Sequence, residues 1–430
     1  MTPHRKMNIY NLFPLIAGPF SKWTPHLKRA SDMGFNWVFI NPIHYPGFSG
    51  SIYSVKDFFR FHPLLIDPAS DMDPGSQAKK MVSTAEDLGL SIMVDLVINH
   101  CAIDSELLKE RPAWFMWDDT GNVVHPSANE DGKTVVWGDL AKFNHNHTSD
   151  PEGLFRFFFS IIKSLTDLGI KGFRCDAAYQ VPGNLWTRLI SEIRKIHPET
   201  LFFAETLGCT ADQTMETAKA GFDYIFNSSK WWDLNSRWCI EQYHMTREIA
   251  PSISFPETHD TLRLCEELDG NINGIKQRYL FSALFSAGVM MPIGFEFGFR
   301  KRLHVVETRP DDWENTDIDL TGFIKTVNEI KSRRTIFQEE CPTEMINNID
   351  NPNVFALWKA SIHSKDEALI LINRDLHNKQ AFTVDRLRNL VQAGKPLVDV
   401  SPEYRLNYIP EPFSYELRPG QGIVLVTERN

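Results

Sequence analysis

The sequence lacks the features of a membrane protein, a disulfide scaffold or a nucleic-acid-binding protein. It contains no run of eighteen apolar residues, so no segment is expected to span a membrane. The six cysteines are scattered, without CxxC pairs or zinc-site spacing, which predicts reduced, mostly buried thiols in a cytoplasmic protein. The formal net charge of −10 argues against a nucleic-acid-binding surface.

The sequence also lacks internal repeats, low-complexity tracts and a continuous apolar stretch near its start. His4, Arg5 and Lys6 are followed by polar residues and Pro14, whereas a secretory leader has an uninterrupted apolar segment. The contents of 42% hydrophobic and 23% charged residues are those of an ordinary globular protein. Most of the 11 Trp and 30 Phe are expected in the core, although aromatic faces also bind sugar rings, so a carbohydrate ligand is allowed.

Eight apolar, β-rich segments alternate with amphipathic segments over most of the chain. In one amphipathic segment, Leu185, Leu189, Ile190 and Ile193 follow helical spacing. Eight strand–helix units predict an α/β fold of the (β/α)8 TIM-barrel type, with a parallel sheet. The expected strands are 8–16, 35–43, 91–98, 170–178, 200–206, 221–227, 252–258 and 288–297, and the expected helices include 24–33, 76–88, 151–168 and 184–196.

Two segments depart from this alternation and suggest a domain organisation. Residues 101–150 separate the third expected strand from its helix and are polar. After about residue 337 the pattern becomes a series of short strands typical of an antiparallel domain. We therefore expect a catalytic barrel over 1–100 and 151–336, a small inserted lobe over 101–150, and a C-terminal β-sandwich domain over 337–430.

The segment GFRCDAA (172–178) reads as a buried strand that ends in charged residues. Residues two apart on a strand share a face, so Arg174 and Asp176 point the same way and Cys175 points away. A cation beside a carboxylate lowers the pKa of that carboxylate and keeps it ionised, as a nucleophile requires. Taken alone, the segment is better explained by a structural ion pair, because such pairs also shift pKa values.

Polar side chains also follow three other expected strands, at the barrel end where active sites lie. A single Asp or Asn there is explained as a helix cap, but carboxylates from the fourth, fifth and seventh strands are not. The side chains outside 172–178 are Asp95, Asn99 and His100 at the end of the third strand, Glu205 at the end of the fifth, and Glu257, His259 and Asp260 at the end of the seventh.

These strand ends carry a resemblance to a known family. The segments DLVINH (95–100), GFRCDAA (172–178), FAET (203–206) and ETHD (257–260) resemble the four ordered signature segments of the α-amylase family, glycoside hydrolase family 13. SIYSVKDFF at 51–59 and GFEFG at 294–298 also resemble segments that this family has after its second strand and at the end of its eighth strand.

The resemblance implies a role for each matching residue. Asp176 matches the nucleophile, Glu205 the general acid/base, and Asp260 the carboxylate that holds sugar hydroxyls and stabilises the transition state. The remaining matches contact the substrate or support the site: Arg174 is the partner of the nucleophile, Tyr53 stacks on the sugar, Asp95 is structural, and His100 and His259 contact sugar hydroxyls.

The implied activity is that of a retaining glycosidase on α-linked glucosides or α-glucans such as maltooligosaccharides. The reaction proceeds through a covalent glycosyl-aspartate, with hydrolysis and some transglycosylation, and needs two carboxyl groups roughly 5–5.5 Å apart. A maltosyl- or glucosyltransferase that uses phosphate or a sugar phosphate is an alternative. A non-catalytic carbohydrate-binding barrel is another, disfavoured because Asp176, Glu205 and Asp260 are all present. The oligomeric state is left open.

Several positions depart from the family pattern. Thr258 stands where the family usually has Asn, and Tyr179–Gln180 replaces a Lys-His pair that shapes the acceptor side, which weakens the case for endo-acting α-amylase specificity. Lys142 stands where many members have a calcium-binding Asp, so neither a metal nor a cofactor is expected. The short lobe ending in WGDLAKFN resembles that of maltosyltransferase-like members.

The acceptor side of the expected site contains aromatic residues that favour a bound sugar over water. We expect it to be built from Tyr179, Gln180, Thr206 and Leu207, together with the lobe. The lobe supplies three tryptophans that are candidates to cover the cleft: Trp114, Trp117 and Trp137.

Overall fold

The computed structural model describes residues 6–130, 133–347, 349–392 and 395–427. Among these residues, eight short parallel strands form a closed barrel in the order β1-β14-β13-β12-β11-β10-β5-β2. The strands are β1 (Asn8–Leu12), β2 (Trp37–Ile40), β5 (Ser91–Leu96), β10 (Gly172–Cys175), β11 (Leu201–Ala204), β12 (Tyr224–Phe226), β13 (Ser252–Ser254) and β14 (Gly288–Pro292). The predicted (β/α)8 barrel is therefore confirmed.

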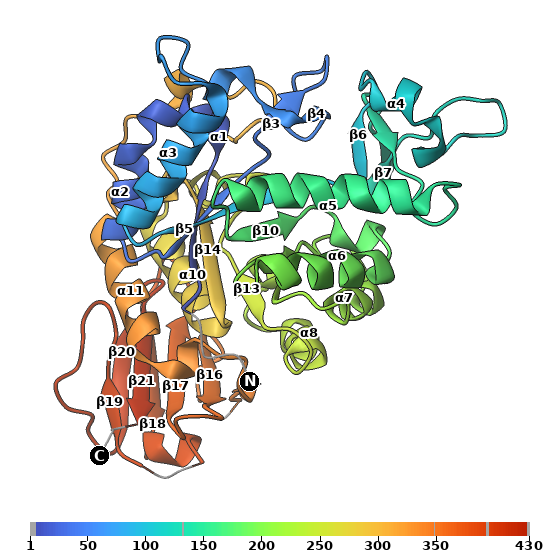
Figure 1. Cartoon of the computed structure of the whole chain (residues 1–430). Coiled ribbons are helices and arrows are strands. Elements are labelled where there is room, and N and C mark those ends of the chain that lie inside the picture. The colour runs from blue at the N-terminus through green and yellow to red at the C-terminus, as the bar shows by residue number, and fades with distance from the viewer. Residues whose placement is uncertain (1–5, 131–132, 348, 393–394, 428–430) are drawn as a thin grey trace.

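A helix follows each barrel strand and covers the outside of the barrel (Figure 1). Several helices begin at side-chain caps: Asp73, Asp150 and Asn271 each accept a hydrogen bond from a backbone N–H of the first turn. These eight helices are α2 (Thr24–Asp32), α3 (Pro74–Asp87), α5 (Pro151–Asp167), α6 (Gly183–Ile196), α7 (Ala211–Ala218), α8 (Trp238–Thr246), α10 (Ile272–Phe285) and α11 (Thr321–Arg333). A short helix, α1 (Pro14–Ala17), precedes α2.

The inside of the barrel is filled by large apolar side chains. A buried cluster contains Trp37, Phe39, Phe203 and Tyr224 from neighbouring strands. Gly172 leaves room for this packing, because a Cβ atom there would lie 2.9 Å from the Trp37 ring. The filled interior leaves the carboxyl ends of the strands as the place where polar side chains gather.

Two insertions lie at that end of the barrel. After β2, strands β3 (His44–Pro46) and β4 (Val55–Phe61) form an antiparallel pair. After β5, a lobe contains β6 (His100–Ala102) paired with β9 (Leu140–Lys142), β7 (Ser127–Glu130) paired with β8 (Lys133–Val136), and the short helix α4 (Leu107–Glu110). Figure 1 shows this lobe projecting to one side, as expected for an insertion after the third barrel strand.

The C-terminal strands are antiparallel, as predicted. A five-stranded sheet is accompanied by a two-stranded sheet, and the alternating side chains of β16 and β17 face two different cores. Leu357 and Ile370 belong to the main core, the large buried cluster that also contains barrel-strand residues such as Val94 and helix residues such as Ile190. Ala356 and Leu371 pack toward the two-stranded sheet. The strands are β15 (Thr343–Met345), β16 (Val354–Ala360), β17 (Glu367–Asn373), β21 (Gly422–Thr427) and β19 (Leu397–Asp399) in one sheet, and β18 (Gln380–Val384) with β20 (Phe413–Leu417) in the other.

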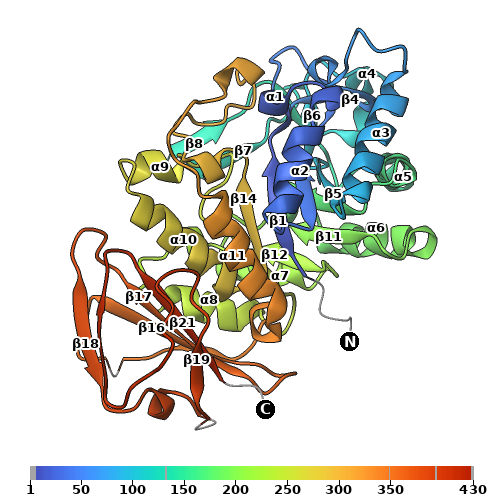
Figure 2. The same cartoon turned by 90° about the vertical axis from the view of Figure 1, so that its left-hand side faces the viewer.

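Figures 1 and 2 both show these strands below α10 and α11, at the end of the barrel opposite the lobe. The C-terminal domain packs along α10: Asn271, at the start of this helix, donates to the Leu376 carbonyl, and Gln277 donates to the Asn373 carbonyl. No helix in the described part of the chain is long and apolar enough to cross a membrane.

Candidate active site

A buried arginine joins two carboxylates at the end of β10. The register of β10 and β5 sets Arg174 opposite Asp95 on the neighbouring strand. The Arg174 Nη1 atom lies 2.9 and 3.0 Å from the two carboxylate oxygens of Asp95 and 2.7 Å from Asp176 Oδ1. Arg174 and Asp176 thus share a face, as predicted, and the guanidinium is ion-paired with the Asp176 carboxylate.

Glu205 follows β11 and is held by two backbone donors. Its Oε2 atom accepts the N–H of Ala177 at 2.8 Å, and Oε1 accepts the N–H of Leu207 at 2.8 Å. Ala177 aims its N–H at Glu205 from a left-handed conformation with φ of 41°, which is rare for a residue other than glycine. Arg174 Nη2 lies 3.9 Å from Glu205 Oε2, so a single guanidinium is within ion-pair range of both Asp176 and Glu205.

The pKa of Glu205 is raised to about 7, mainly because burial disfavours the charged carboxylate. The negative charges of Asp176 and Asp260 raise this pKa further, while Arg174 and the Leu207 N–H oppose the shift. Asp176 therefore raises the pKa of Glu205, but burial is the larger cause. The sequence alone did not reveal how deeply Glu205 is buried.

Asp260 lies at the rim of the site. Its side chain is 60% exposed, and its Oδ2 atom lies 3.1 Å from His259 Nε2. Its backbone carbonyl accepts a hydrogen bond of 2.7 Å from Arg302 Nη2. The third carboxylate is thus on the open side of the site, where a bound molecule would have access to it.

Tyr53 connects the strand ends to the loop after β2. Its hydroxyl donates to Asp95 at 2.6 Å and lies 2.7 Å from His259 Nε2, so the histidine is the donor in the second bond. The two rings are parallel, with centroids 5.5 Å apart. His100 Nε2 donates to the Tyr53 carbonyl at 3.1 Å. Burial lowers the pKa of both histidines, so both are neutral at physiological pH.

These residues surround an open pocket of about 320 Å³, which we call the barrel-end pocket. All the predicted site residues line it except Asp95, which lies beneath it and bonds to Arg174 and Tyr53. The lining residues are Ser51, Tyr53, Asn99, His100, Trp137, Asp139, Leu140, Arg174, Asp176, Ala177, Tyr179, Gln180, Glu205, Leu207, His259, Asp260 and Val305.

Only part of the predicted acceptor side faces this pocket. Tyr179, Gln180 and Leu207 line it, whereas Thr206 is buried and donates to the Phe226 carbonyl. Among the lobe tryptophans, Trp137 alone of the three lines the pocket. Trp114 is buried in the core and Trp117 donates to the Pro112 carbonyl, so neither covers the cleft.

Asp139 is a fourth carboxylate in the barrel-end pocket that the sequence interpretation missed. It lies between β8 and β9, and its Oδ2 accepts a 2.6 Å hydrogen bond from Ser49 Oγ in the loop after β3. Asp139 belongs to the segment WGDLAKFN, whose resemblance to a family segment was evident from the sequence. The position of its carboxylate over the barrel, however, depends on the contact between two loops. Glu257, by contrast, is buried with Arg263 at 3.2 Å and does not line the pocket.

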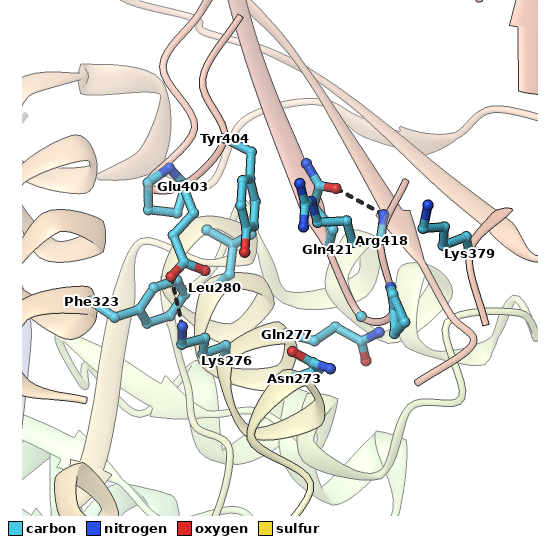
Figure 3. A pocket seen from close by; sticks show the side chains of 14 residues that line it. Asn273, Lys276, Gln277, Leu280, Phe323, Lys379, Glu403, Tyr404, Arg418 and Gln421 are labelled. Atoms are coloured by element: carbon cyan, nitrogen blue, oxygen red, sulfur yellow. Dashed lines mark hydrogen bonds and ion pairs between the residues drawn. The ribbon is translucent and has the colours of Figure 1, made fainter. Parts of the chain in front are cut away.

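A second hollow of about 230 Å³ lies between α10 and the C-terminal strands (Figure 3). Figure 3 shows Glu403 beside Lys276, to which it is ion-paired at 2.6 Å, and Gln421 bonded to the backbone of Arg418. Glu403 is the only carboxylate among the described residues that line this hollow, and Lys276 neutralises it. Paired carboxyl groups for acid/base chemistry are therefore found at the barrel-end pocket.

The residues that the structure describes contain no group of three or more His, Cys, Asp or Glu side chains placed to hold a metal ion. Lys142 lies on β9, opposite His100 of β6.

Comparison with known proteins gives a consistent family relationship. The family model of the glycogen debranching enzyme glucanotransferase domain matches residues 2–119. The alpha-1,4-glucan:maltose-1-phosphate maltosyltransferase of Burkholderia pseudomallei is 26% identical over 388 residues, which cover 87% of this chain and 34% of that protein. The enzyme of the same name from Mycobacterium tuberculosis is 24% identical over 403 residues, covering 86% of this chain and 55% of that protein. The chain thus spans between a third and about half the length of these relatives.

Solved structures of α-amylases share the fold over the whole chain. The maltogenic α-amylase AmyB of Thermotoga neapolitana has a TM-score of 0.77 at 20% identity and covers 99% of both chains. The α-amylase of Geobacillus thermoleovorans, solved with acarbose, has a TM-score of 0.77 at 15% identity and covers 99% of this chain and 98% of that one.

The closed barrel with its lobe after the third strand and its C-terminal β-domain agrees with the four signature segments and with these relatives. The chain is therefore similar in sequence to maltosyltransferases and in fold to α-amylases, in agreement with its resemblance to the α-amylase family, glycoside hydrolase family 13.

Proposed function

We propose that this protein is a retaining glycosidase and transglycosylase that acts on α-linked glucans or maltooligosaccharides. The observation that carries the proposal is the pair of carboxyl groups around Arg174, which lies 2.7 Å from Asp176 and 3.9 Å from Glu205. One member of the pair is ion-paired and the other has a pKa of about 7. This difference suits a nucleophile and a general acid, respectively.

The first half-reaction transfers the glycosyl group to the enzyme. Asp176 attacks the anomeric carbon while the proton of Glu205 passes to the departing glycosidic oxygen. The bond between the anomeric carbon and that oxygen breaks, and an ester to Asp176 forms with inverted configuration. Asp260, at the exposed rim, is placed to hold hydroxyl groups of the sugar as positive charge develops on the ring.

The second half-reaction releases the glycosyl group to an acceptor. Glu205, now ionised, takes a proton from water or a sugar hydroxyl, and the resulting oxygen attacks the anomeric carbon. The Asp176 ester breaks and the configuration is inverted again, so the product keeps the α-configuration. Tyr179 and Trp137, which line the barrel-end pocket, supply aromatic surface for a sugar acceptor.

The substrate class and cellular location are part of the proposal. The names of the curated relatives concern α-1,4-glucan, which supports a glucan substrate. A cytoplasmic location is supported by the six cysteines, all of which are free thiols, five of them buried.

Maltosyl transfer that uses a sugar phosphate is the second candidate, because the same relatives are named for maltose-1-phosphate. A non-catalytic carbohydrate-binding barrel is disfavoured, since Asp176, Glu205 and Asp260 all line one pocket.

Product analysis with maltoheptaose tests the proposed reaction. Proton NMR at early times should show new reducing ends in the α-configuration, together with products longer than the substrate. Asp176→Asn and Glu205→Gln should each lower turnover by several orders of magnitude with the fold retained by circular dichroism. Asp119→Asn, an exposed change in the lobe, is the matched control. New β-configured ends, or near-normal turnover by Asp176→Asn, would overturn the proposal.

A further inference from the structure

The barrel-end pocket carries a strong excess of negative charge. Four carboxylates line it, those of Asp139, Asp176, Glu205 and Asp260. Arg174 is the only cationic residue among the described residues that line the pocket. Its guanidinium is already bound to Asp176 and to the buried Asp95, a fifth carboxylate directly beneath the pocket. No positive charge is therefore left over for an anionic ligand.

The donors near Glu205 are also committed. The leaving group of a glycosyl donor lies on the side of the general acid, where a phosphate would need N–H groups or cations. The backbone N–H groups of Ala177 and Leu207 both donate to the Glu205 carboxylate. The other polar side chains lining this side are Tyr179 and Gln180, which carry no charge.

The cations closest to the pocket do not line it. Arg302 is exposed at the rim, where its Nη2 donates to the Asp260 carbonyl and its positive charge acts on His259. Lys142 lies two residues beyond the lining residue Leu140, and its charge acts on His145 on the side of α5. Lys56 is ion-paired with Asp104 at 2.8 Å. None of the three lines the pocket.

We infer that the barrel-end pocket selects uncharged glycosyl donors and acceptors and excludes phosphorylated ones, with Asp139 as a specificity-determining charge. This inference rests on the proposed glycosyl transfer through Asp176 and names its substrate class. A phosphate monoester would bring up to two further negative charges into a pocket lined by Asp139 and the exposed Asp260 carboxylate, where the cation of Arg174 is already paired with Asp176 and Asp95. The chain thus differs in donor class from relatives named for maltose-1-phosphate.

The direct test compares donors that share the maltosyl group and differ in charge. The full chain is assayed with p-nitrophenyl α-maltoside, maltoheptaose and α-maltosyl phosphate, and with inorganic phosphate or glucose as acceptor. We expect kcat/KM for α-maltosyl phosphate to be lower than for the nitrophenyl maltoside by about 100-fold or more, because like charges face each other in a partly dehydrated pocket. We also expect no maltosyl phosphate to form from inorganic phosphate.

Charge variants identify the residue responsible. Asp139→Asn should raise the ratio of phosphate-donor to nitrophenyl-donor kcat/KM by about 5- to 10-fold, the size of one charge–charge interaction at a partly exposed site. Gln180→Lys, which adds a cation on the leaving-group side, should raise the same ratio about 10-fold. Asp119→Asn changes the net charge equally, but this exposed residue does not line the pocket, so the ratio should not change.

The dependence of this ratio on ionic strength distinguishes charge repulsion from a purely structural effect of the substitutions. The ratio should rise as ionic strength increases from about 0.01 M to about 1 M, where the Debye length falls from about 30 Å to about 3 Å. Two results would overturn the inference without affecting the proposed glycosyl transfer. The first is a wild-type ratio near or above one. The second is a ratio for Asp139→Asn and Gln180→Lys that equals the ratio for Asp119→Asn. Turnover of no donor at all, charged or uncharged, would overturn the proposed function itself.

Discussion

At the scale of single residues, the proposed mechanism makes the protonation of Glu205 set the pH range of the first half-reaction. Its pKa is raised to about 7, chiefly by burial, and the protonated form is the one that donates to the leaving oxygen. We therefore expect kcat/KM for maltooligosaccharides to fall as pH rises through about 7, as the carboxyl group loses its proton. A pH profile of initial rates measures this directly.

The assignment of that alkaline limb to Glu205 can be checked by removing the carboxyl group. In Glu205→Gln, a substrate whose leaving group needs no protonation, such as a nitrophenyl glycoside, should lose less activity than a natural glucan. Its residual activity should also lack the fall near pH 7. An equal loss on both substrates, or an unchanged alkaline limb, would show that another group is the acid.

The sequence predicted most of the polar residues of the barrel-end pocket, and the residues that it did not predict were missed for two physical reasons. Asp176, Arg174 and Asp95 were predictable because they lie at the carboxyl ends of short buried strands whose order fixes their neighbours. Asp139 was not, because its position depends on the Ser49 hydroxyl from a different loop. The two backbone donors to Glu205 were not predictable either, since Ala177 adopts a left-handed conformation that its side chain does not signal.

At the scale of elements, the lobe places one aromatic ring over the barrel. Trp137, at the end of β8, lines the barrel-end pocket, whereas Trp117 is 46% exposed outside it. Trp137→Ala should lower the ratio of transglycosylation to hydrolysis by about 2- to 10-fold, the effect of one lost aromatic stacking contact. Chromatography of early products from concentrated maltoheptaose measures this ratio. Trp117→Ala is the control, and equal effects of the two variants would contradict the placement of Trp137.

The pairing of β6 with β9 bears on metal dependence. Lys142 of β9 stands opposite His100, where the family often has a calcium-binding Asp in the corresponding segment. A cation there opposes calcium, so chelator treatment should leave both activity and the melting temperature nearly unchanged. Differential scanning calorimetry with and without chelator tests this. A large fall in melting temperature that added calcium reverses would contradict it.

Elements with regular periodicity were predicted well, and short or non-local ones were not. The eight barrel strands and the helices after them were evident from alternating β-rich and amphipathic segments. Strand β15 has only three residues, and β3 pairs with β4 with shifts in register. Neither feature therefore gives a regular alternation of apolar and polar residues in the sequence. The sequence did not indicate which of the three lobe tryptophans faces the pocket. Trp114 is buried and Trp137 lines the pocket only because of how the folded lobe packs.

At the scale of the whole molecule, the C-terminal sheet shares its core with the barrel. Ile370 of β17 is buried among residues of the main core, whereas Leu371 packs toward the two-stranded sheet. Ile370→Ala should lower the free energy of unfolding by about 2–5 kcal/mol, because it leaves a cavity in that shared core. Activity and circular dichroism should be lost in one thermal transition. Separate transitions, with the barrel active after the C-terminal sheet has unfolded, would contradict a shared core.

The general architecture followed from the sequence because strand number, strand order and the position of the insertion are all properties of the chain in linear order. How the C-terminal sheet packs against α10 and α11 was not accessible, since that contact is made by apolar side chains whose partners lie far away in sequence. The net charge of −10 also gave no indication that four carboxylates gather at one pocket.

The central claim of this account is that Asp176 forms a covalent bond to the sugar. A fluorinated α-glycosyl fluoride, which forms the intermediate faster than it breaks down, should add one glycosyl mass to the protein. Peptide mass spectrometry should place that mass on Asp176, and Asp176→Asn should remain unlabelled. Labelling of Glu205 or Asp260 instead, or turnover of the natural substrate with no glycosyl-enzyme detected and an inverted product, would contradict the account.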